Sequence, residues 1–355
     1  MRSILSATTL LLAALGFATT VSAQSPAVSP AEADLAKQQA AQQQSQPLNN
    51  QPGWREVRSG LPQMTTQRGR ETDILIQPQG QTWRALRNGQ VTLWGGWLLV
   101  AMVLAVAAFY WRRGTIPLSE PPTGRKVRRF STGERVVHWA TAVSFCVLAL
   151  TGLVVTFGKN ILLPLLGYTL FSWLATLSKT LHNFVGPLFA VSLLIVVFTF
   201  VKDNIANAAD WVWLRKAGGM LGDGHEVPSH RFNAGEKGMF WWGVCIPGLV
   251  VVGSGLVLDL LVPGWGQTRG QMQVAHMIHA LAAVIMMTML IGHIYMGTVG
   301  VKGALGAMKT GWVDEGWARE HHSLWLDDIK AGRIPAQRSL PAGAAAPGSA
   351  PAIPS

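Results

Sequence analysis

The stretch that most constrains this chain is VAHMIHALAAVIMMTMLIGHIYMGTVG, residues 274–300. It is apolar throughout and exceeds the roughly 20 residues that a helix needs to cross the hydrocarbon of a bilayer. Three histidines nevertheless lie in it: His276, His279 and His293. Ionisable side chains at membrane depth are costly and mark functional sites. The stretch therefore predicts a membrane-spanning helix that carries a site.

The spacing of these histidines indicates what kind of site. Fourteen residues separate His279 from His293, which is about 21 Å along a helix and about 40° in azimuth. His276 lies about 100° from His293 by the same geometry, so His279 is the better partner. One helix thus offers two imidazoles on nearly one face, as a helix that holds two stacked haems does. Histidines that bond to neighbouring helices or relay protons remain the alternative.

Composition narrows the class of protein. Only 13% of the residues are charged and mean hydropathy is +0.27, which is typical of an integral membrane protein. The net charge of +11 does not indicate nucleic-acid binding, because the basic residues cluster at the ends of apolar segments. Two cysteines, Cys146 and Cys245, cannot hold an iron–sulfur cluster, and no CxxCH haem motif exists. A redox centre in this chain would need histidine ligands.

The N-terminal part reads as an exported segment. Residues 1–23 have a basic start, a short apolar core and small residues before Gln24, which predicts a signal peptide. Residues 24–92 are rich in Gln, Pro, Ala and Ser and predict a mostly disordered periplasmic arm. Some of its apolar residues could dock on a partner or on the membrane surface: Trp54, Ile74, Ile76, Trp83 and Leu86.

Five membrane spans follow, and charge orients them in the bacterial inner membrane. The predicted spans are residues 93–111, 135–157, 181–201, 238–258 and 273–299. The basic linker 112–134 and the tail 301–355 are expected in the cytoplasm, with the arm in the periplasm. Residues 158–180, broken by Pro164 and Gly167, are expected to lie at the interface. The predicted fold is an all-α membrane protein, with a four-helix haem-binding bundle over 135–300 and one extra N-terminal transmembrane helix.

Four histidines fall at two depths in this topology. His182 and His279 are at the periplasmic level, whereas His138 and His293 lie toward the cytoplasm. Two levels with two histidines each predict two bis-histidine sites. Because no carboxylate lies within these spans to complete another coordination shell, a b-type haem is the favoured occupant.

Four motifs carry a resemblance to a known family. They are RVVHWATAVSF, LHNFVGPLF, RFNAGEKGMFW and IHALAAVIMMTMLIGHIYMGTVGVKGALGAMKTGWVDEGWAREHHSLW. In order, spacing and tail, residues 128–330 resemble the gamma subunit of respiratory formate dehydrogenases, a membrane cytochrome b. The signal, the arm and the first span lie outside the resemblance.

The resemblance implies a site assignment. The haem ligands would be His138, His182, His279 and His293, paired as depth suggests. A quinone site would lie on the cytoplasmic side and involve Asn233 and His293. Relatives read NAGQK where this chain reads NAGEK, so Glu236 either helps to carry protons or, as we favour, is a charge at a helix N-terminus.

The resemblance also implies a function. Two haem b groups would pass electrons from an iron–sulfur beta subunit, fed by a molybdenum or tungsten alpha subunit, to menaquinone or ubiquinone. This chain would hold no catalytic residue for formate and would contact membrane lipid but no nucleic acid. One alternative is the cytochrome b of a NiFe-hydrogenase or thiosulfate-reductase complex. The other is a haem-free membrane anchor or a proton-relay transporter.

The remaining histidines and the paired tryptophans are expected to have other roles. His276 is expected to be structural, and His225 and His230 to be solvated. His321 and His322 are expected to face a docking partner. Trp241 and Trp242 are expected to be interfacial aromatics.

Overall fold

The computed structural model describes residues 34, 37–38, 40–41, 54, 58–59, 79–219, 227–266, 268–334 and 339–340. The predicted signal peptide 1–23, most of the arm, His225 and the end of the tail lie outside these residues. The chain divides into two compact units, each considered by itself below. Unit 1 comprises Met1–Trp94 and Ser254–Ala280, and unit 2 comprises Gly95–Gly253 and Leu281–Ser355.

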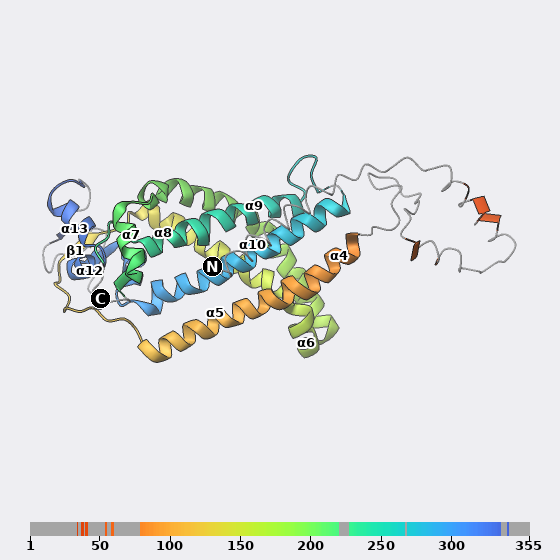
Figure 1. Cartoon of the computed structure of the whole chain (residues 1–355), viewed down its shortest axis with the longest axis horizontal. Helices are drawn as coiled ribbons and strands as arrows, with labels where there is room; N and C mark the ends of the chain where they lie inside the picture. The colour runs from red at the N-terminus through yellow and green to blue at the C-terminus, as the bar shows by residue number, and fades with distance from the viewer. Residues whose placement is uncertain are drawn as a thin grey trace, which may run out of the picture. The chain divides into compact units, whose positions relative to one another are not determined.

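The protein is an all-α membrane protein (Figure 1). Among the described residues, four helical segments are long and apolar enough to cross a membrane: Gln79–Arg113, Thr132–Asn204, Ala234–Leu258 and Arg269–Gly300. In chain order the elements are α4 (Gln79–Ala85), η1 (Leu86–Val91), α5 (Thr92–Arg113), β1 (Lys126–Arg128), α6 (Thr132–Phe200), η2 (Val201–Asn204), α7 (Ala208–Arg215), η3 (Ala217–Gly219), α8 (Ala234–Gly238), η4 (Met239–Cys245), α9 (Ile246–Leu258), α10 (Arg269–Tyr295), η5 (Met296–Gly300), α11 (Ala304–Thr310), β2 (Trp312–Asp314), α12 (Glu315–His321), α13 (Ser323–Lys330) and β3 (Ser339–Leu340).

Helix α6 is a hairpin rather than one rod. A straight helix of 69 residues would be on the order of 100 Å long, against about 30 Å of hydrocarbon. Gly167 has φ 71° and ψ 173°, which a glycine adopts easily. The two halves then pack antiparallel, with Phe145 beside Phe189 at 6.4 Å between ring centroids. Figure 1 shows this helix running out, reversing and returning.

This hairpin corrects the expectation for residues 158–180. They are helical except at Gly167, and Pro164 lies inside the helix. The helix is therefore interrupted at Gly167 alone.

The N-terminal helix is longer than predicted. It begins at Gln79 instead of residue 93, so residues 79–92 are helical and do not belong to an irregular arm. Within unit 2, α5 packs closely on its neighbours through small residues. A Cβ on Gly95 would lie 3.2 Å from Val284, and one on Gly96 would lie 3.2 Å from Phe157. The extra helix is thus fitted to α6 and α10.

The segment after α10 folds back as a small cap on the rest of unit 2. β1 pairs with β2 in antiparallel register, Val127 opposite Val313, and β3 pairs with the other edge of β1. Val127 is fully buried, and Trp325 of α13 is 1% exposed. They share one apolar core with Phe200 of α6. The first part of the predicted tail 301–355 is therefore an ordered part of the fold.

A buried carboxylate ties the cap together. Glu315, at the start of α12, is 1% exposed and lies 3.1 Å from Arg125, 3.4 Å from Arg319 and 2.5 Å from Lys330. The bond from Lys330 holds the pKa of this carboxyl below its usual range. Three cations around one buried anion link the linker before β1 to both terminal helices.

Candidate functional site

His138 and His293 face each other inside unit 2. Their ring centroids are 6.4 Å apart and the rings are tilted by 58°. Two imidazoles bound through nitrogen to one metal ion between them, with bonds of about 2.0 Å, would have centroids roughly 6 Å apart. Nδ1 of His138 is buried and has no hydrogen-bond partner within the described part of the chain. The pair therefore fits an axial position on each side of one iron.

His182 is held by a hydroxyl group from the other half of the α6 hairpin. Oγ1 of Thr151 lies 2.8 Å from its Nδ1. The Thr151 hydroxyl already donates to the Val147 carbonyl at 2.8 Å, so its oxygen accepts from the ring. His182 thus carries its proton on Nδ1, and Nε2 keeps the lone pair that binds a metal. Gly152 lies against the ring, since a Cβ there would lie 3.5 Å from its Cε1, an ordinary van der Waals distance.

His279 has a similar surrounding within unit 1. Oγ of Ser254 lies 3.2 Å from its Nδ1. A Cβ on Gly255 would lie 3.2 Å from its Cε1. A hydroxyl residue followed by glycine therefore meets a histidine twice in this protein, at Thr151–Gly152 and at Ser254–Gly255. The sequence analysis missed these four residues, and a search for hydroxyl–glycine pairs in the spans would have found them.

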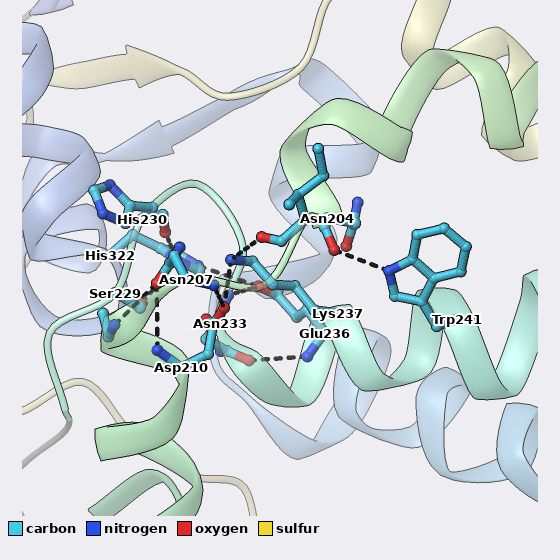
Figure 2. Close-up of polar contacts among 12 residues, drawn as sticks. Asn204, Asn207, Asp210, Ser229, His230, Asn233, Glu236, Lys237, Trp241 and His322 are labelled. Atoms are coloured by element: carbon cyan, nitrogen blue, oxygen red, sulfur yellow. Dashed lines mark hydrogen bonds and ion pairs between the residues drawn. The ribbon is translucent and has the colours of Figure 1, made fainter.

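The NAGEK motif begins helix α8 (Figure 2). The Asn233 side chain accepts the Glu236 N–H at 2.9 Å, and the Glu236 side chain accepts the Asn233 N–H at 3.0 Å. This reciprocal pair is a capping box. It favours the reading of Glu236 as a charge at a helix N-terminus. Glu236 also lies within electrostatic range of His293, so the motif and this histidine belong to one region of unit 2.

Arg129 and His322 complete the surroundings of Glu236. Nη2 of Arg129, a residue only 4% exposed, donates to Oε1 of Glu236 at 2.9 Å. Nδ1 of His322 donates to the His230 carbonyl at 2.8 Å, which leaves Nε2 facing Glu236 at 3.8 Å. Burial, together with the nearby Arg129 charge, lowers the pKa of His322 to about 3. His322 is therefore a neutral acceptor at pH 7.

This burial corrects the expectation for the two tail histidines. His321 is 6% exposed and His322 is 1% exposed, and both rings pack on Trp317. They are core residues of the cap and cannot present a docking surface. The cap folds over them because its helices bury their tryptophans against β1 and α6.

A second polar group joins α7 to α8 (Figure 2). Nζ of Lys237 donates to Asp210 at 2.8 Å and to the Ile205 carbonyl at 3.0 Å. Nε1 of Trp241 donates to the Asn204 carbonyl at 2.9 Å. Since Lys237 and Asp210 are both buried and paired, they fix α7 against the NAGEK motif.

The structure also gives the positions of the remaining histidines and of Trp242. His230 lies at the surface, 3.4 Å from Asp328, and Trp242 is 65% exposed, as expected for a solvated histidine and an interfacial aromatic. His276 lies in unit 1 beside Trp83, at 5.7 Å between ring centroids. Among the residues that the structure describes, no three His, Cys, Asp or Glu side chains form a metal-binding group.

Comparison with known proteins gives a consistent result. Residues 129–311 match the family described as prokaryotic cytochrome b561. The chain is 30% identical over 205 residues to the formate dehydrogenase cytochrome b556(fdo) subunit of Escherichia coli K12, covering 57% of this chain and 92% of that protein. It is 30% identical over 211 residues to the nitrate-inducible cytochrome b556(Fdn) subunit of the same organism, covering 56% and 88%. It is 24% identical over 214 residues to the formate dehydrogenase cytochrome b556 subunit of Haemophilus influenzae, covering 56% and 82%.

Proposed function

This chain belongs to the prokaryotic cytochrome b561 family and to the formate dehydrogenase cytochrome b556 subunits, and on that premise we propose that it passes electrons from a formate dehydrogenase to quinone through two haem b groups. The family is one of b-type cytochromes, so the chain is a haem b protein. Haem b supplies reversible one-electron transfer. The protein's part is to ligate the haems, orient them and set their surroundings.

The observation that carries the proposal is the His138–His293 pair. Two imidazoles face each other at 6.4 Å between centroids, in an apolar helical bundle where an unliganded pair would be costly. We assign this pair to one haem. His182 and His279 are assigned to the second haem, because the sequence places them at one depth and each has a hydroxyl group beside Nδ1.

The quinone would bind beside the haem of His138 and His293. Asn233 contributes its side-chain nitrogen as a donor, because its Oδ1 is taken by the helix cap. Glu236 contributes negative charge within range of His293. The capping bond and the Arg129 pair hold Glu236 in place, so its role in the site is structural.

The topology implied by the charged loops sets the direction. An iron–sulfur subunit, fed by a molybdenum or tungsten subunit that oxidises formate, would deliver electrons on the periplasmic side. Quinone would be reduced toward the cytoplasm and take its protons there. Each charge moved against 100 mV stores about 2.3 kcal/mol. The chain itself would not act on formate.

The same proposal assigns each terminal segment of the chain to one side of the membrane. Residues 1–23 direct export, and residues 24–78 lie in the periplasm of a bacterium with this chain in its inner membrane. The cap and the remainder of the tail lie in the cytoplasm. Arg112 and Arg113 in the last turn of α5 and the basic segment 125–129 support this orientation.

Purification of the chain from native membranes tests the assignment. We expect co-purification of an iron–sulfur subunit and a molybdopterin-containing subunit, with two haem b per chain by pyridine haemochrome. If hydrogenase or thiosulfate-reductase subunits co-purified instead, the chain would belong to that electron-donating complex. Absence of haem from the purified complex would leave a membrane anchor or a proton-relay transporter.

A further inference from the structure

Unit 1 holds three buried polar atoms that have no partner within the described residues. They are Nε1 of Trp83 in α4, and Oε1 of Gln273 and Nδ1 of His276 in α10. The Trp83 and His276 rings meet edge to face at 5.7 Å. Buried polar atoms are normally satisfied, and each exception calls for a ligand or a water. Three exceptions within one small region indicate a site.

Arg87 places a positive charge near these three atoms. Arg87 lies within electrostatic range of His276. It belongs to η1, the π-helical turn between α4 and α5, where the Thr92 hydroxyl bonds the Arg87 carbonyl at 2.5 Å. π-helical turns of this kind occur frequently at functional sites. The turn therefore brings a guanidinium and the Trp83 N–H into one region with His276.

The site is one helical turn from a proposed haem ligand. His276 precedes His279 by three residues, about 4.5 Å along α10 and on a neighbouring face. Oγ of Ser254 lies 3.2 Å from Nδ1 of His279, so under the proposed function Nε2 is the ring nitrogen that would hold the iron. A haem held by His279 would bring negatively charged propionate groups into this region, where side chains one turn away could bind them.

We propose that Trp83, Arg87 and His276 bind a propionate carboxylate of the haem that His279 ligates, so that the N-terminal helix outside the family match completes this haem site. The proposal rests on the proposed function. A guanidinium is a strong ligand for a carboxylate, and the Trp83 and His276 N–H groups would add hydrogen bonds to the same anion. Oε1 of Gln273 would accept a hydrogen bond from the carboxyl form or from a water.

An anionic lipid headgroup has the same chemistry and could reach the same donors. A propionate and a lipid headgroup can be distinguished by the effect of removing a hydrogen-bond donor on the midpoint potential of the haem. Removing a donor from a propionate leaves more negative charge beside the iron, which favours the ferric state and lowers the midpoint potential. Removing a donor from a lipid phosphate alters lipid binding.

The test is a potentiometric titration of the purified complex, followed at the b-type α band, in nanodiscs of neutral lipid. Trp83→Phe keeps the ring and removes the N–H, and Arg87→Gln removes the charge. We expect each to lower the potential of one of the two haems, with a tenfold change in its reduction equilibrium corresponding to about 59 mV. Trp94→Phe, at a residue 68% exposed on α5, is the matched control and is expected to leave both potentials unchanged.

The outcomes are separable. Unchanged potentials in both variants would overturn the propionate assignment while leaving the cytochrome intact. A shift that requires anionic lipid in the nanodisc would assign the site to a headgroup and also overturn it. A wild-type complex without haem would contradict the proposed function itself, before any variant is compared.

Discussion

The hydroxyl oxygen of Thr151 lies 2.8 Å from Nδ1 of His182, and this contact determines which nitrogen of the ring carries the proton. The hydroxyl proton is committed to the backbone of its own helix. The ring must therefore donate from Nδ1 and keep its lone pair on Nε2. Such partners orient metal-binding histidines, and losing one typically costs 10–100-fold in metal affinity.

Thr151→Val keeps the shape of the side chain and removes the acceptor. We expect haem to leave this site about 10–100 times more readily, measured as the rate of haem transfer to apomyoglobin. Thr199→Val is the control, because that hydroxyl bonds the Ile195 carbonyl of its own helix. Equal rates in the two variants would contradict the role of Thr151.

The two glycines beside the histidines provide a matched pair. A Cβ on Gly255 would lie 3.2 Å from Cε1 of His279, whereas one on Gly152 would lie 3.5 Å from Cε1 of His182. The first contact is tight and the second is ordinary van der Waals contact. Gly255→Ala is expected to lower haem content and shift the α band, and Gly152→Ala is expected to resemble the wild type. If Gly152→Ala lost haem and Gly255→Ala did not, the close contact between residue 255 and the ring of His279 would be contradicted.

Glu236→Gln separates the two readings of the NAGEK motif. Glutamine retains an oxygen for the capping bond to Asn233 but loses the charge paired with Arg129. We expect quinone reduction to continue and the free energy of unfolding to fall by about 1–3 kcal/mol, measured by formate–quinone assay and thermal unfolding. If quinone reduction stopped while formate still reduced the haems, Glu236 would be a proton carrier.

His322 makes stability depend on pH in the acid range. Burial lowers its pKa from 6.5 to about 3 in the folded protein, so between these values the unfolded chain binds the extra proton. The free energy of unfolding is therefore not reduced by His322 above pH 6.5. Below pH 6.5 it falls as the pH decreases, by at most about 1.4 kcal/mol per pH unit.

The substitution His322→Gln should reduce the dependence of the free energy of unfolding on pH. Melting temperatures in detergent at pH 8, 7, 6 and 5 would show a difference between variant and wild type that changes only below pH 6.5. Parallel curves across the whole range would contradict the burial of a neutral imidazole.

The four ligand candidates could be predicted from the sequence because imidazoles in apolar spans are rare, and depth alone pairs His138 with His293. The membrane fold follows from the length of the apolar segments. The hairpin in α6 could not be placed, since Pro164 and Gly167 both read as breaks and only packing shows that Gly167 alone turns the chain.

The surroundings of the histidines were also beyond the sequence. Thr151 and Ser254 are ordinary residues of apolar helices until the fold brings them to a ring nitrogen. His321 and His322 look like exposed tail residues because groups that contact them lie far away in the sequence: Nδ1 of His322 donates to the carbonyl of His230, 92 residues earlier. The helical character of residues 79–92 was hidden by their polar composition, which resembles that of the preceding arm.

The central claim is that formate reduces b-type haem held by these histidines. An anaerobic difference spectrum of membranes containing the assembled complex tests it most directly, with formate as the only reductant and dithionite as the reference for full reduction. We predict that formate raises the α band to most of the dithionite level, and that His293→Leu abolishes the contribution of one haem. An α band that appears with dithionite alone would contradict formate as the donor, and its absence with both would contradict the haem assignment.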